Sequence, residues 1–117
     1  MGTARIELRD VLLDARSLIT LPGNCFDWSS WEDADAAVRE IDGLVAVLDG
    51  GRSPSRLSMS VLFAPTGPIQ EVSLSSGWAE EFLAIAERFD AAEGAFYRRG
   101  AWWRRLLNWR LGVTQRT

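Results

Sequence analysis

The sequence has no histidine and only one cysteine, Cys25, among its 117 residues. Histidine is the usual general base near neutral pH, and sets of Cys and His are the usual zinc ligands, so both kinds of site are excluded. A single cysteine also excludes an internal disulfide. Without histidine, the Cys25 thiol would need a helix N-terminus or an arginine to become a nucleophile, and we expect it to be a small buried apolar residue instead.

Lysine is absent too, and no glycine-rich loop follows a strand, so the common phosphate-binding motifs are missing. No apolar run is long enough to cross a bilayer, and no leader peptide is visible, so we expect a cytoplasmic protein. Acidic side chains are the only remaining acid–base groups, and we interpret them as helix-dipole partners or a solvated face. We therefore expect no catalytic residue, metal or cofactor. The carboxylates considered are Asp27, Glu32, Asp33, Asp35, Glu80, Glu81 and Glu87.

The composition, with 47% apolar and 25% charged residues, is that of one small globular domain. Its charge is divided unevenly along the chain. Residues 1–95 hold seven arginines and all 16 acidic residues, a net charge of −9, whereas residues 96–117 hold six arginines and no acid. We therefore predict an acidic domain over 1–95 and a basic aromatic tail over 96–117, helical and packed on the body.

Hydrophobic spacing predicts two N-terminal helices. Apolar residues recur every three or four positions over residues 3–20, before Pro22 and Gly23 end the pattern. The same spacing runs from about Ser30 to Asp49, with acidic residues in the first turn and glycines after the last.

Alternation predicts a β-hairpin in the middle of the chain. Apolar residues alternate with serines over 57–63 and again over 72–75, and a Pro/Gly turn separates the two segments. A two-stranded ribbon is marginal alone, so we expect it to lie on the helices or to form a homodimer by edge pairing. A third helix follows, with an apolar face running from Trp78 to Phe96. The predicted class is α+β: two helices, a hairpin, a long helix and a basic C-terminal helical segment.

Two aromatic groups are candidates for binding. The first lies before and within the start of the second helix, where tryptophan beside acidic residues is typical of a protein-binding hot spot. Its residues are Asp27, Trp28, Trp31, Glu32 and Asp35. The alternative is that Trp31 staples the helix and its aromatic neighbours plug the edge of the core.

The second group is the tail, where aromatic residues interleave with arginine. Such segments bind anionic membranes, single-stranded nucleic acid or acidic protein surfaces, or they fold back on their own acidic domain. The candidate contacts are Arg98, Arg99, Trp102, Trp103, Arg104, Arg105 and Trp109.

An acidic domain without catalytic residues suits a protein that binds basic surfaces, such as the substrate groove of an enzyme acting on nucleic acid. In size and charge the chain is similar to small bacterial immunity proteins, which neutralise a toxin by covering its active site. We therefore predict a protein-binding domain of the immunity or antitoxin type, whose partner is a basic toxin or nucleic-acid enzyme. The alternative is a peripheral membrane or nucleic-acid adaptor that acts through the tail.

Overall fold

A computed structural model describes residues 2–97, and in this part of the chain every regular element is a helix. Two long helices, α1 (Thr3–Ile19) and α2 (Ala34–Asp49), precede two short ones, α3 (Arg56–Phe63) and α4 (Pro68–Ser76), and a final long helix, α5 (Ala79–Phe96). The predicted α+β class is therefore wrong for residues 2–97. The two predicted N-terminal helices are confirmed, although α2 begins four residues later than expected because Asp33 accepts from the N–H of Ala36 as its N-cap.

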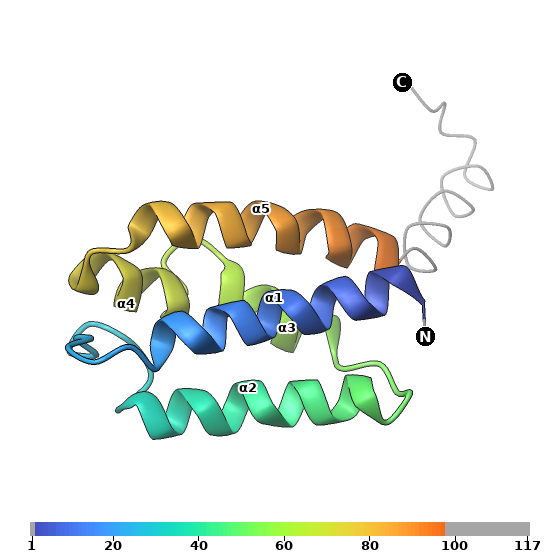
Figure 1. The fold of residues 1–117 in the computed structure, drawn as a ribbon, viewed down its shortest axis with the longest axis horizontal. Coiled ribbons are helices and arrows are strands. Elements are labelled where there is room, and N and C mark those ends of the chain that lie inside the picture. The colour runs from blue at the N-terminus through green and yellow to red at the C-terminus, as the bar shows by residue number, and fades with distance from the viewer. Residues whose placement is uncertain (1, 98–117) are drawn as a thin grey trace, which may run out of the picture.

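Helix α1 lies at the centre of the bundle, with α2 and α5 on either side of it and antiparallel to it (Figure 1). α4 contacts both α1 and α5, and α3 contacts α4 and α5. The apolar stripe of α1 is wide enough to serve two neighbours at once. Its buried members are Leu8, Val11, Leu12, Ala15 and Ile19.

Two ion pairs fix the register of α1 against α2. Arg9 Nε donates to Asp49 Oδ1 at 2.7 Å, and Arg16 Nε donates to Asp42 Oδ1 at 2.8 Å. The pairs are two helical turns apart on both helices, so they form together only in one antiparallel register. Exposed pairs of this kind contribute little energy, but a slip of one helix along the other would break both at once.

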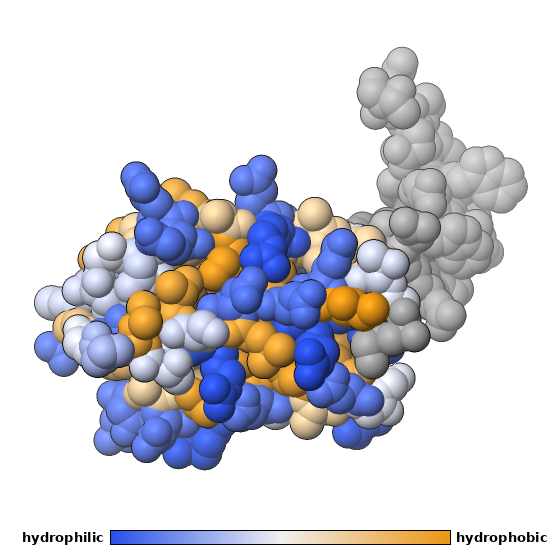
Figure 2. Space-filling model, viewed as in Figure 1, coloured by the Kyte–Doolittle hydropathy of each residue, from blue (hydrophilic) through white to orange (hydrophobic). Residues whose placement is uncertain are grey.

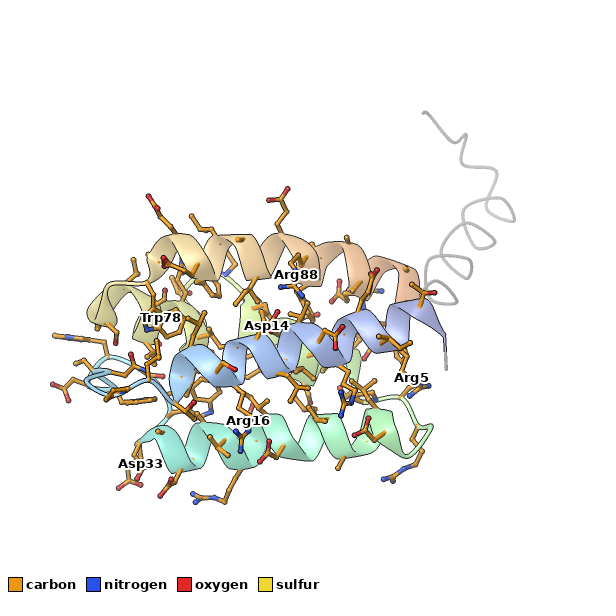
Figure 3. The ribbon with its side chains drawn as sticks, in the orientation of Figure 1. Arg5, Asp14, Arg16, Asp33, Trp78 and Arg88 are labelled. Carbon is orange, nitrogen blue, oxygen red and sulfur yellow. The ribbon has the colours of Figure 1, made fainter. Side chains whose placement is uncertain are left out.

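Arg5 joins three elements at the end of the bundle that lies opposite the α1–α2 turn (Figure 3). Its Nη1 donates to the carbonyl oxygen of Leu48, in the last turn of α2, at 2.9 Å and to that of Arg52 at 2.7 Å. Its guanidinium also lies over the ring of Phe96 in α5, 5.1 Å from the centroid. A positive charge is favourable there because the C-terminus of a helix carries partial negative charge.

The segment predicted as the first strand is α3. Alternation over 57–63 fails at Leu62, and the side chains that are buried follow helical spacing, at Met59, Leu62 and Phe63. Leu57 and Val61, which a strand would have placed on the same face as Met59, are 73% and 49% exposed. Ser55 caps the N-terminus of the helix, because its hydroxyl accepts from the N–H of Ser58.

The segment predicted as the second strand is α4, which buries Ile69 and Val72 and leaves Leu74 exposed. Gly67 and Pro68 form its N-terminus rather than a hairpin turn. A Cβ on Gly67 would lie 2.5 Å from the carbonyl oxygen of Val61, so only glycine allows α3 and α4 to approach this closely. Within residues 2–97 there is consequently no strand edge through which the expected homodimer could pair.

The predicted third helix is confirmed as α5, but it is shorter at its start. Gly77 lies outside it and ends α4 in the left-handed conformation with φ +87°. The apolar face predicted from spacing is buried at Phe82, Ile85, Phe89 and Ala92, and Phe89 stacks on Phe63 with ring centroids 4.2 Å apart. None of the described helices combines the length and the apolarity needed to cross a membrane.

Candidate functional site

The loop between α1 and α2, residues 20–33, is fixed to the bundle by hydrogen bonds of its own side chains and backbone. Asn24 Nδ2 donates to the carbonyl oxygens of Leu18 and Ile19, at 2.8 and 2.9 Å, and Asn24 Oδ1 accepts from Trp78 Nε1 at 2.9 Å. Cys25 N–H donates to the hydroxyl of Ser76 at 2.9 Å. The loop is thus held against the end of α1, the end of α4 and the start of α5.

Trp31 belongs to the core and not to the surface. Its side chain is only 5% exposed, and its Nε1 donates to Glu40 Oε1 on α2 at 3.1 Å. The position of Trp31 therefore agrees with the alternative interpretation, in which this ring packs at the start of the second helix and does not bind a partner. Trp78 has the same character, 6% exposed with its indole N–H bonded to Asn24.

Trp28 differs from these two rings because 75% of it is exposed. The other members of the predicted binding patch, Asp27, Glu32 and Asp35, are also exposed. The structure therefore separates Trp31 from the predicted group and leaves one exposed tryptophan with three exposed carboxylates. An indole held in water by a fixed loop buries little on folding, so stability does not account for it.

The chain segments around Trp28 carry acidic residues and no arginine. No arginine occurs between Arg16 and Arg39 or between Arg56 and Arg88, and these stretches supply the α1–α2 loop, the end of α4 and the start of α5, which meet at one end of the bundle (Figure 1). We call this region the acidic end. Its exposed acidic residues are Asp27, Glu32, Asp33, Asp35, Glu80 and Glu81, and its exposed apolar residues are Leu21, Trp28 and Leu74.

Sequence reasoning did not place Leu21, Leu74, Glu80 and Glu81 at the same end of the bundle as the patch. The two arginine-free stretches were the available signal, but nothing local indicates that they meet in space. Figure 3 shows the result, with Asp33 and Trp78 at one end of the bundle and Arg5 at the other.

The opposite end and the flanks of the bundle hold its arginines. Arg9, Arg16, Arg56 and Arg88 each pair with a carboxylate. The Arg88 pair joins α5 to Asp14 of α1 at 2.7 Å, and the two labelled side chains point toward one another in Figure 3. On the face formed by α1, α2 and α5, hydrophilic and hydrophobic residues are interleaved (Figure 2). These four ion pairs involve four of the 16 acidic residues. The other 12 carboxylates form no ion pair within residues 2–97.

No group of three or more Cys, Asp or Glu side chains within residues 2–97 is arranged to hold a metal ion. Cys25 is half-buried, between Asn24 and the aromatic loop residues. A second group of interacting polar side chains lies far from the acidic end, where Glu93 accepts from Arg56 Nη2 at 3.3 Å and from the Ser60 hydroxyl. Burial, and then the charge of Glu93, raise the pKa of the adjacent Tyr97.

The predicted tail contacts lie outside the described residues: Arg98, Arg99, Trp102, Trp103, Arg104, Arg105 and Trp109. The first two residues of the predicted tail, Phe96 and Tyr97, are described and pack on the body. The Tyr97 hydroxyl donates to the carbonyl oxygen of Pro54 at 2.8 Å, and Arg56 lies over its ring.

No known protein family, curated protein or solved structure matches the chain. The properties of its own residues are therefore the basis for inferring its function.

Proposed function

We propose that the chain is a protein-binding domain whose acidic end docks on a basic surface of a partner protein. An enzyme that acts on nucleic acid has such a surface in its substrate groove, and covering that groove is how an immunity or antitoxin type of inhibitor works. The observation that carries the proposal is Trp28, 75% exposed on a fixed loop among exposed carboxylates.

Tryptophan is among the residues that contribute most to binding when an interface buries them. Trp28 is also presented at low entropic cost, because Asn24 and Cys25 already hold its loop against α1 and α4. A loop that is ordered before binding loses less conformational freedom when the complex forms.

Charge favours a basic partner. The arginine-free acidic end gives a local field of one sign, which accelerates encounter with a positive surface and repels acidic ones. Binding through this end should therefore weaken as salt is added, because exposed charges are screened within about 10 Å at 0.1 M ionic strength.

The test compares three forms of the full chain, each immobilised and exposed to an extract of the source organism. The forms are the wild type, Trp28→Ser and the control Leu57→Ser, which removes an equally exposed apolar side chain from α3, where 73% of Leu57 is accessible. We expect one protein to be retained by the wild type and the control and lost from Trp28→Ser. With that protein purified, Trp28→Ser should raise Kd by about 30-fold or more, the effect of a hot-spot residue.

Equal binding of the partner to wild type and Trp28→Ser would refute the assignment of the acidic end. Retention of nucleic acid or lipid in place of a protein would refute the proposed class and support the tail-based adaptor.

A further inference from the structure

The α1–α2 loop contains a tight turn whose two central residues are Asp27 and Trp28. The N–H of Ser29 donates to the carbonyl oxygen of Phe26 at 3.1 Å, which closes a β-turn around them. Both central side chains are exposed, whereas Phe26 and Ser29 are half-buried and Phe26 packs against the core. We call Asp27 and Trp28 the tip. The tip therefore protrudes between two residues that are partly enclosed by the bundle.

The loop is bonded to both ends of α4, with one bond on each side of the tip. Before the tip, the N–H of Cys25 donates to the hydroxyl of Ser76, the last residue of α4. After the tip, the hydroxyl of Ser29 donates to the carbonyl oxygen of Pro68, the first residue of α4, at 3.2 Å. The helix has nine residues, so these two ends are about 12 Å apart at the rise of an α-helix. The loop thus crosses the length of α4 and is held at both sides of the crossing.

The Ser29 hydroxyl has a second partner, because it also accepts from the N–H of Trp31 at 3.2 Å. Trp31 is 5% exposed, so one hydroxyl links the tip both to α4 and to a residue of the core. Trp28 has few contacts of its own, since 75% of it is exposed. The backbone of the turn therefore determines where its indole points, and Ser29 is the side chain that fixes this backbone.

We propose that Ser29 is a positioning residue for partner binding, which holds the tip so that the Trp28 indole enters a concave pocket of the partner in one orientation. The inference rests on the proposed function. A protruding indole is fully buried only in a concavity, and the substrate groove of the proposed partner is concave and carries positive charge for Asp27. Positioning affects affinity because Kd rises in inverse proportion to the fraction of molecules that hold the binding orientation.

NMR relaxation of backbone amides in the free full chain tests the positioning without a partner. In the wild type, the order parameter of the Trp28 amide should be about 0.85, the value of a rigid backbone, and in Ser29→Ala it should fall below about 0.6. Ser29→Thr keeps a hydroxyl and should keep the wild-type value. The matched control is Ser30→Ala, the same change at the next position, where the exposed hydroxyl forms no hydrogen bond within residues 2–97.

Binding of the protein captured by the wild-type chain then tests the consequence. Ser29→Ala should raise Kd by about fivefold, and Ser29→Thr and Ser30→Ala should leave it unchanged. In the Trp28→Ser background, Ser29→Ala should change Kd by less than about twofold, because no indole remains to be oriented. A residue that acts only through the stability of the fold would have the same effect in both backgrounds.

Three results would overturn the inference and leave the proposed function standing: a Trp28 amide that is already flexible in the wild type, an unchanged order parameter in Ser29→Ala, or equal effects of Ser29→Ala on Kd in the two backgrounds. If Trp28→Ser bound the partner as tightly as the wild type, the proposed function would fail and this inference with it. Unchanged amide spectra of α1 and α5 are the check that each variant remains folded.

Discussion

Asn24 offers the sharpest test of how the α1–α2 loop is held. Asn24→Ala removes both hydrogen bonds to the last turn of α1 and the acceptor of the Trp78 indole N–H. The carbonyls of Leu18 and Ile19 lie at a helix end, where water can replace the lost donor. Water cannot replace the lost acceptor of the Trp78 indole N–H, because Trp78 is only 6% exposed.

The magnitude follows from these three bonds. Each hydrogen bond contributes about 1 kcal/mol net, and a buried donor left without a partner costs about 1–3 kcal/mol. We therefore expect Asn24→Ala to lower the free energy of unfolding by about 3 kcal/mol. Trp78→Phe removes the donor together with part of the ring, and we expect it to cost about 1–2 kcal/mol.

The two changes should not add. Once Phe replaces Trp78, the buried N–H is gone, so Asn24→Ala in that background should cost about 1 kcal/mol less than in the wild type. Urea unfolding followed by far-ultraviolet circular dichroism gives all four free energies, and an unchanged m-value would show that each variant unfolds from the same compact state. If the two losses in free energy of unfolding were strictly additive, or if Asn24→Ala lowered it by less than about 1 kcal/mol, the inference that Asn24 holds the loop to α1 and Trp78 would be refuted.

Two further predictions concern α3 and the C-terminal end of α5. Met59→Ala should lower the free energy of unfolding by about 2–5 kcal/mol and Leu57→Ala by less than about 0.5 kcal/mol, because Met59 is buried and Leu57 is exposed when this segment is a helix. Similar losses for the two variants in urea unfolding would contradict the assignment of α3 as a helix. Burial and Glu93 raise the pKa of Tyr97, so the stability that its protonated phenol supplies is complete below about pH 10 and declines as pH rises through the raised pKa. Tyr97 is the only tyrosine, so ultraviolet absorbance of tyrosinate follows it alone, and a midpoint no higher than that of free tyrosine would contradict its burial.

The long helices could be predicted from the sequence because each buries a continuous stripe at helical spacing. The short helices could not, because segments of eight or nine residues can satisfy both alternation and helical spacing. Over 57–63, Leu57, Met59 and Val61 fit a strand, and only Leu62 conflicts with it. Tertiary packing selects the helix, because Met59 and Leu62 fill the core and Gly67 allows α4 to pack closely against α3.

The candidate site shows the same division. The sequence identified an unusual aromatic loop, but it could not distinguish Trp28 from Trp31, which are three positions apart and carry the same side chain. Their positions differ because the Trp31 indole N–H donates a hydrogen bond to Glu40 on α2, whereas the Trp28 side chain is exposed on the loop. The acidic end as a whole depends on three segments that meet only in the folded chain.

The central position of α1 has a consequence for folding during synthesis. α1 leaves the ribosome before the other described helices and can pair with α2 once α2 has followed, but its other partner is α5, and the Asp14–Arg88 pair closes across 74 residues. At about 5–20 residues per second, that partner follows roughly 4–15 s later. Throughout this interval the α5-facing side of α1 is exposed, so the nascent chain should engage chaperones most strongly until Arg88 has emerged.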